Sequence, residues 1–440
     1  MLMEYKHQQS IKNRMLIIVL YLLCFAYIAS YFDVAYDNFV LSYLKWIMLV
    51  ISILALHIKI KLINPNNNRE PMNSKAISMF FFIAALILTN LYLSMNGVTS
   101  LMTVVTLSLS CLFFLLLSKA IKLNIITIFE INKIIFTSIF IIVLISTILY
   151  LTEYMNFMQV LSGSGRYRIK GVFRHPNTLA MNCVVASIAL FDNIRKKTHL
   201  TPKSSVVKYI LLLFFIFQII ASDSNTAKYA LFSFVLLYFF ISKLEHKVSS
   251  LRALQLLSLI TMIVAGLISL TNLLQHVDAS DKSNSLGVRM SSWISILQSI
   301  GTDPIRLLFG FGLSGTGRYT DGSFQQLQLS VDNGYMTFLF QAGLIGLLLL
   351  LCYMVSVLMF IIFKPKKELD KHFVAIVFCC GFCLLLYSMF ENLLIAMGNL
   401  ITLYLWFRIF NFKFQINSQI KKQNERLLTS SWISRREVLK

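Results

Sequence analysis

Charged residues are scarce in this sequence, and their scarcity excludes most classes of soluble protein. Only 13% of the 440 residues are Asp, Glu, Lys or Arg, whereas 57% are hydrophobic and the mean hydropathy is +0.72. A soluble globular domain averages about 25% charged residues. The composition therefore indicates a protein that is embedded in a membrane.

Three other features are also missing. The chain shows no internal repeat of fixed period. Its N-terminus has no short apolar run with a small-residue cleavage site, so we expect residues 15–32 to be a retained helix. No group of cysteines has the spacing of a disulfide framework or a metal site. The seven cysteines lie within long apolar segments, where we expect small packing residues: Cys24, Cys111, Cys183, Cys352, Cys379, Cys380 and Cys383.

Long apolar segments are what the sequence has in abundance. A helix needs about 20 mostly apolar residues to cross about 30 Å of hydrocarbon. We predict an all-α polytopic fold whose spans, about twelve in number, cover 15–32, 39–58, 76–95, 101–118, 134–152, 176–192, 208–222, 226–242, 253–274, 334–362, 372–388 and 392–410. The chain is then divided into spans over 1–274, an extracytoplasmic loop over 275–333, spans over 334–410 and a basic cytoplasmic tail over 411–440.

The basic residues predict the orientation of these spans. With both termini in the cytoplasm, 30 of the 40 lysines and arginines fall in cytoplasmic segments or the tail, as the positive-inside rule requires. We therefore expect a multi-pass protein of the cytoplasmic membrane. Topology and attraction to anionic lipid explain the net charge of +21, and no nucleic acid is needed as a partner.

The ten remaining basic residues are more informative. Lys45 lies within the second predicted span, next to a cavity or reaching toward the interface. The others cluster in a few outward segments, although outward cations are disfavoured, so they indicate an anionic ligand at the outer face. Guanidinium groups bind phosphate oxygens in bidentate fashion. A lipid-linked pyrophosphate would suit these cations, as would carboxylated lipids or acidic polysaccharides. The simpler alternative is that they are solvated or bind lipid headgroups. The nine outward basic residues are Arg166, Arg168, Lys170, Arg174, Lys228, Lys282, Arg289, Arg306 and Arg318.

The loop over 275–333 is predicted to be structured. Trp293, Ile296, Leu297 and Ile300 follow the spacing of an amphipathic helix lying on the membrane or the bundle, and Arg289 lies one turn before Trp293. A glycine-rich turn after Phe309 is expected to bring Arg318 toward the same place. At the end of the loop, Asp332 directly precedes a span, where it can cap the helix or act as a general base. The two roles are compatible.

Three stretches together resemble the O-antigen ligase and O-antigen or capsule polymerase family, the Wzy-type membrane glycosyltransferases. The first runs from Arg168 through His-Pro-Asn to Ala180, and the second from Ser222 to Ala230. The third begins at Gly287-Val-Arg-Met-Ser-Ser-Trp and ends with Asp332-Asn-Gly-Tyr and its following Gly-x-x-Gly run at 343–346. Two departures stand out, because family ligases have a His where this chain has Asp332, and Lys228 replaces the usual Arg.

The resemblance implies a GT-C-like fold and a metal-independent glycosyl transfer, without a cofactor, at the outer face. The substrate would be an oligosaccharide on undecaprenyl pyrophosphate in the lipid bilayer, and the most consistent function is a polysaccharide polymerase for capsule, exopolysaccharide or O-antigen. A chain-length regulator and a flippase of the same pathway would be partners. Asp332 and Arg289 would be catalytic. The residues that would bind the pyrophosphate are Arg168, Arg174, Lys228, Arg166 and Arg318. The residues that would order the site are His175, Asn177 and Trp293.

Two other functions remain open at this point. A ligase would move finished glycan to a different acceptor, and it differs from a polymerase only in that acceptor. A flippase for the same lipid-linked oligosaccharide would be a transporter, a class that tends to show repeats, broken helices and charges at the membrane midplane. Here only Lys45 is a basic residue deep in a predicted span.

Overall fold

The computed structural model describes residues 2–36, 38–63, 97–151, 158–160, 167–195, 202–243, 293–312 apart from positions 295, 299 and 302, 333–363 and 371–412. Within them, six helices are long and apolar enough to cross a membrane, and four shorter helices are also apolar. The prediction of a helical, polytopic membrane protein is confirmed. Two of the predicted spans, 76–95 and 253–274, lie outside the described residues, so the predicted total stays a prediction.

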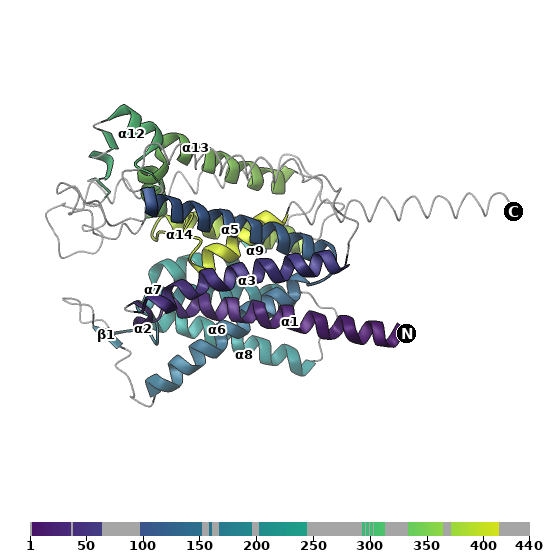
Figure 1. The fold of residues 1–440 in the computed structure, drawn as a ribbon. Helices are drawn as coiled ribbons and strands as arrows, with labels where there is room; N and C mark the ends of the chain where they lie inside the picture. The colour runs from purple at the N-terminus through teal and green to yellow at the C-terminus, as the bar shows by residue number, and fades with distance from the viewer. Residues whose placement is uncertain are drawn as a thin grey trace, which may run out of the picture.

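The described elements form one bundle of helices with a small sheet at one end (Figure 1). Figure 1 shows α2, β1 and α12 at the end of the bundle opposite the N-terminus of α1. A further helix, Leu400–Phe412, closes the described part of the chain. The labelled elements are α1 (Leu2–Ala29), α2 (Asp33–Tyr36), α3 (Phe39–Ile63), α5 (Gly97–Lys122), α6 (Ile128–Leu151), β1 (Met158–Val160), β2 (Tyr167–Ile169), α7 (Pro176–Arg195), α8 (Pro202–Ala221), α9 (Asn225–Lys243), α12 (Pro304–Phe309), α13 (Gly334–Phe363) and α14 (Lys371–Ser388).

Helix α7 is the central helix of the bundle. Of its span, 83% is buried, compared with 56% for α6, the next most buried of the six candidate spans, and it packs against α6, α8 and α9. Its sequence explains this position: Pro176 suits the first turn, and small residues such as Ala180, Cys183 and Ala186 let neighbouring helices approach closely. The loop that leads into α7 is therefore attached to the central helix of the bundle.

The two-stranded sheet was not part of the predicted all-α fold. Strands β1 and β2 pair antiparallel, with Gln159 opposite Arg168. Between β2 and α7 the chain turns tightly, and the buried ring of Phe173 packs edge-to-face on Phe32 at the end of α1. The sheet and this turn hold Arg168 a few residues before α7 begins.

Helix α13 is broken near its start, whereas the sequence predicted one continuous span over 334–362. Gly343 adopts φ 65° and ψ −173°, outside helical geometry. The carbonyls of Phe340 and Gln341 accept instead from the backbone N–H groups of Phe311 (2.8 Å) and Gly312 (2.9 Å). The loop that follows α12 therefore docks on the break by backbone hydrogen bonds.

We expect a Gly343→Ala substitution to lower the free energy of unfolding by about 3 kcal/mol or more. A Cβ at this position would lie 2.3 Å from the Leu308 carbonyl oxygen and 2.4 Å from the Phe309 nitrogen, and its φ is unfavourable for alanine. The midpoint of thermal unfolding in detergent measures the effect. Gly301→Ala is the matched control, because a Cβ there meets nothing within 4 Å; equal midpoints for the two variants would contradict the prediction.

A small cluster of apolar side chains joins the long loop to α13. Trp293, Ile296 and Ile300 are buried together with Phe311, Leu339 and Phe340. The prediction that this stretch forms an amphipathic helix on the bundle fits these contacts for three of its four stripe residues. Leu297 is the exception, because 48% of it is exposed.

The predicted span over 392–410 begins too early. Its helix starts at Leu400, and residues 389–399 form a series of non-helical turns. Side chains of the helix support this backbone, since Trp406 Nε1 donates to the Leu394 carbonyl (2.8 Å) and Thr402 Oγ1 to the Leu393 carbonyl (2.9 Å). Irregular backbone of this kind is tolerated at membrane depth where protein groups satisfy it.

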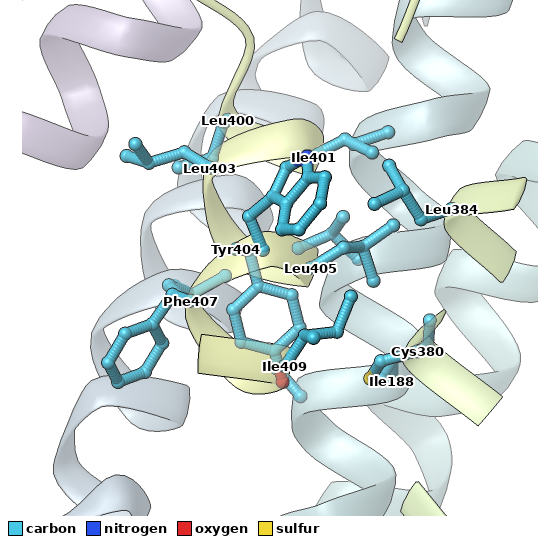
Figure 2. Close-up of a cluster of buried hydrophobic side chains, with 14 of the residues drawn as sticks. Ile188, Cys380, Leu384, Leu400, Ile401, Leu403, Tyr404, Leu405, Phe407 and Ile409 are labelled. Carbon is cyan, nitrogen blue, oxygen red and sulfur yellow. The ribbon is translucent and has the colours of Figure 1, made fainter. Parts of the chain in front are cut away.

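The 400–412 helix lies in the core. Figure 2 shows Ile409 of this helix on the side of Ile188 of α7 and Cys380 of α14, with Leu403 and Phe407 on the opposite side. Six of the cysteines are buried within the apolar core, as predicted for packing residues, whereas Cys352 is exposed. The helix thus contributes directly to the packing around α7.

A buried polar network joins the start of α6 to the ends of α7 and the 400–412 helix. Arg408 donates to Asp192 Oδ2 (2.6 Å), which also accepts from Asn132 (2.8 Å), and Tyr404 donates to Asn132 (3.1 Å). Arg408 and Asp192 are only 1% and 3% exposed. Arg408 is one of the 30 basic residues counted on the predicted cytoplasmic side, and its charge is buried against a carboxylate from a distant helix.

Candidate functional site

Arg168 is held at the end of the bundle where α7 begins, which we call the site end. Its guanidinium donates from Nε to the Ser222 carbonyl (2.8 Å) and from NH2 to Asn177 Oδ1 (2.7 Å). The residue is 9% exposed. Two neutral oxygens therefore fix the plane of the positively charged guanidinium. One is the Ser222 carbonyl at the end of α8, and the other is Asn177 Oδ1 in the first turn of α7.

Asn177 links Arg168 to a carboxylate from the last part of the described chain. Its Nδ2 donates to Glu391 Oε1 (2.6 Å) while its Oδ1 accepts from Arg168. Glu391 lies in the non-helical turns that follow α14, and its own backbone N–H bonds to the Tyr387 carbonyl (2.9 Å). The result is a chain of side chains in the order Glu391, Asn177, Arg168.

The first turn of α13 lies beside the same turns. A Cβ on Gly334 would be 3.0 Å from the Leu394 nitrogen and 3.2 Å from Ser388 Cβ, and Tyr335 Oη donates to the Leu385 carbonyl (2.8 Å). The described parts of the three stretches that carried the family resemblance therefore meet at the site end. They are separate in the sequence but share neighbours in the fold.

The capping role considered for Asp332 is filled by Asn333. Its Oδ1 accepts from the backbone N–H groups of Tyr335 (2.9 Å) and Met336 (3.0 Å), the pattern of a helix N-cap. Asp332 itself lies outside the described residues, as do Arg166, Arg289 and Arg318. For Asp332 this leaves the general-base role, which stays a prediction.

Two of the outward lysines are engaged by nearby carboxylates. Lys228 pairs with Asp223, the residue at φ 48° in the turn between α8 and α9, and Lys170 pairs with Asp33. The Lys228 pair lies next to Ser222, so its charge is close to the Arg168 site. Both lysines are partly exposed, so these ion pairs are expected to contribute about 1 kcal/mol or less.

The remaining described candidate residues lie in the loop before α7 and in the apolar cluster on α13. His175 Nδ1 accepts from the Asn177 backbone N–H (3.1 Å) at the start of α7. The backbone N–H of Arg174 bonds to the Tyr31 carbonyl (3.0 Å), and its side chain is exposed. Trp293 is buried in the cluster on α13, where its contacts are with apolar side chains of the loop and the helix.

Lys45 is fixed by neutral groups close to the site end. Its Nζ donates to the Gly398 carbonyl (3.1 Å) and lies 5.2 Å and 5.6 Å from the centres of the Tyr31 and Trp46 rings. Cation–π contacts and a carbonyl stabilise an ammonium without neutralising it. Both alternatives given for Lys45, a place next to a cavity and a reach toward the interface, stay predictions.

Described basic residues of the predicted cytoplasmic side lie at the opposite end of the helices. Arg195, at the C-terminus of α7, stacks on Tyr238 near the C-terminus of α9, and Tyr238 contacts His372 at the N-terminus of α14 (2.7 Å). Lys208 lies over the Phe129 ring where α8 and α6 begin. The site and these residues are therefore at opposite ends of the bundle, and which end faces the cytoplasm stays a prediction.

Glu391 is the site residue that sequence reasoning missed. It falls in the short turn between the predicted spans 372–388 and 392–410, where hydropathy assigns only a connection. The one available signal was a carboxylate in an otherwise apolar turn facing the predicted outer side. Only the fold shows that it reaches Asn177, 214 residues earlier in the chain.

These features define a polytopic membrane protein with a fixed guanidinium, an amide and a carboxylate at one end of its bundle. Residues 210–351 match the family model described as O-antigen ligase (Wzy_C). Residues 210–351 thus correspond to an O-antigen ligase domain, which belongs to a family of lipid-linked polysaccharide ligation and polymerisation, and the resemblance found in the second and third stretches is confirmed. No curated protein matches the chain.

The matched residues cover the second and third of the resembling stretches and include Ser222, which accepts from Arg168. The first stretch, with Arg168 and Asn177, precedes the match. Its contact with Ser222 connects it physically to the matched domain, and its contact with Glu391 connects it to residues beyond the match. Chemically, the arrangement offers a preorganised cation for phosphate oxygens and a place for a carboxylate at the start of α13.

Proposed function

We propose that this protein is a polysaccharide polymerase that joins undecaprenyl-pyrophosphate-linked repeat units at the outer face of the cytoplasmic membrane. The observation that carries the proposal is the position of Arg168, held by Ser222 and Asn177 where the three family stretches meet. A guanidinium fixed by two hydrogen bonds is preorganised to bind pyrophosphate oxygens, so little rearrangement is needed when negative charge develops.

The proposed reaction is a single displacement at the donor sugar. A hydroxyl of the acceptor repeat unit attacks the anomeric carbon, its proton passes to Asp332, and the bond from that carbon to the pyrophosphate oxygen breaks. Undecaprenyl pyrophosphate leaves with the bonding electron pair. Arg168 and Arg289 stabilise this leaving group, with Arg174, Lys228, Arg166 and Arg318 in the surrounding positive field, so that no metal ion is required.

The ligase alternative concerns the acceptor alone. The matched family covers both ligation and polymerisation, and Asp332 in place of the family ligases' His favours the polymerase. The break in α13 is a feature that transporters also show. Here, however, its freed carbonyls are occupied by the N–H groups of Phe311 and Gly312, which favours a structural joint over a transport site.

Purified protein in nanodiscs with one lipid-linked repeat unit tests the proposal. A polymerase produces a ladder of products, each longer by one repeat. A single mass shift on an added second acceptor would assign the ligase alternative. The absence of any product, together with transfer of the lipid-linked glycan between leaflets in liposomes, would assign the flippase.

We expect Asp332→Asn to reduce polymer formation by about 100-fold or more, since a general base contributes at least that much, while the unfolding midpoint stays unchanged. The reason is that Asn333, and not residue 332, caps α13. Asn333→Ala is the matched control, with a loss of about 1 kcal/mol in stability. A destabilised Asp332→Asn protein, or one that retains full activity, would contradict the assignment.

A further inference from the structure

We infer that Glu391 is a positioning residue for the pyrophosphate-binding site and that it acts through Asn177 on Arg168. This inference rests on the proposed function and adds a residue from the last part of the described chain to the site. It also assigns a role to the turns at 389–399, which lie outside the matched domain at 210–351.

The first step of the argument is the orientation of the Asn177 amide. An amide has two ends of opposite character, because its oxygen accepts hydrogen bonds and its nitrogen donates them. Glu391 Oε1 accepts from Asn177 Nδ2 at 2.6 Å, so the amide oxygen is directed to Arg168 NH2 at 2.7 Å. A carboxylate accepts from the amide and cannot donate to it, so only one orientation of Asn177 satisfies both neighbours.

The second step is the effect on Arg168. Its guanidinium is planar, and the Ser222 carbonyl holds it from one side through Nε. The Asn177 oxygen supplies the second point that fixes the plane. Without a fixed amide, the guanidinium loses this second point, so its plane is less well fixed and its charge is held less firmly where phosphate oxygens bind.

The third step is that Glu391 is itself well supported. Its backbone N–H bonds to the Tyr387 carbonyl (2.9 Å) and its carbonyl accepts from the Leu393 N–H (2.8 Å). The neighbouring Leu393 and Leu394 carbonyls are bound by Thr402 and Trp406 of the 400–412 helix. Hydrogen bonds therefore hold the backbone that carries this carboxylate, and holding it there is a reason for the irregular segment between α14 and that helix.

A reciprocal exchange of the two side chains tests this inference. Asn177→Asp alone places two carboxylates opposite each other and is expected to raise the KM for the lipid-linked donor by about 10-fold to 100-fold, the range for losing a hydrogen bond to a charged group. Adding Glu391→Gln supplies an amide donor to the new carboxylate, whose other oxygen accepts from Arg168. The double variant should recover most of the donor KM, whereas a residue with a purely structural role would not be rescued.

Single changes at position 391 complete the test. Glu391→Ala should raise the donor KM more than Glu391→Gln, because the glutamine oxygen still accepts from Asn177, although with the weaker bond of a neutral group. The matched control is Glu130→Gln, since Glu130 caps α6 through Thr127 at the opposite end, and it should leave the donor KM unchanged. Unfolding midpoints identify any variant that loses activity by misfolding.

The outcomes separate this inference from the proposed function. If the wild type forms polymer and binds undecaprenyl pyrophosphate in nanodiscs, a double variant no better than Asn177→Asp would overturn the inference and leave the function intact. An unchanged donor KM in Glu391→Ala would do the same. A wild type that neither binds undecaprenyl pyrophosphate nor forms polymer would overturn the proposed function and the inference together.

Discussion

Replacing Arg168 with alanine is expected to lower the rate of polymer formation by about 100-fold or more, the loss seen when a preorganised charge-stabilising group is removed. The side chain is buried between Ser222 and Asn177, so no exposed neighbour can take its place. Arg168→Lys should lose most of this activity too. A lysine keeps the charge but lacks the planar fork that reaches both oxygens and a phosphate together.

The measurement is the initial rate of repeat-unit transfer by purified variants. Arg195→Lys is a suitable control, because Arg195 lies on the rings of Phe191 and Tyr238 at the opposite end of α7. It should leave the rate unchanged at equal amounts of folded protein. Full activity in Arg168→Lys would show that charge alone suffices and that the fixed geometry is not used.

Breaking the buried ion pair between Asp192 and Arg408 is expected to destabilise the bundle by about 3–5 kcal/mol. Asp192→Ala leaves a guanidinium that is 1% exposed without the carboxylate that holds it. Removing one partner of a buried pair is costly because the other charge stays desolvated. The pair also joins α7 to the 400–412 helix, so the packing of the central helix depends on it.

Replacing both partners separates the charge effect from the loss of packing. The double variant Asp192→Leu with Arg408→Met removes both charges and keeps apolar volume, so it should recover most of the lost stability. Asn132 and Tyr404 would still bond to each other (3.1 Å). Unfolding midpoints in detergent measure both effects, and a double variant less stable than Asp192→Ala would contradict this account.

Hydropathy predicted the described long helices well, because a membrane span is specified mainly by a run of apolar residues. It failed where apolar residues do not form a straight helix. Leu393, Leu394 and Ile395 are apolar but lie in turns before the 400–412 helix, and Gly343 breaks α13 within an apolar run. In both places the backbone is held by groups outside the segment itself: Thr402 and Trp406 of the following helix in one, and Phe311 of the loop after α12 in the other.

The site was partly predictable for a similar reason. Arg168 and Asn177 are nine residues apart around the start of one helix, so their proximity follows from local sequence. The pairing of Lys228 with Asp223 had a local signal too, since they lie five residues apart around the start of α9. Glu391 reaches the site only through the packing of α14 and the 400–412 helix around α7, and no local pattern in a single sequence indicates such a contact.

The most direct test of the central claim is to count products and leaving groups in one reaction. Purified wild-type protein is supplied with a lipid-linked repeat unit, and the new glycosidic linkages and the released undecaprenyl pyrophosphate are quantified over time. We predict one undecaprenyl pyrophosphate for each linkage in a growing ladder, with both signals lost in Arg168→Ala. Linkages without an equal release of undecaprenyl pyrophosphate, or an unaffected Arg168→Ala variant, would contradict the account.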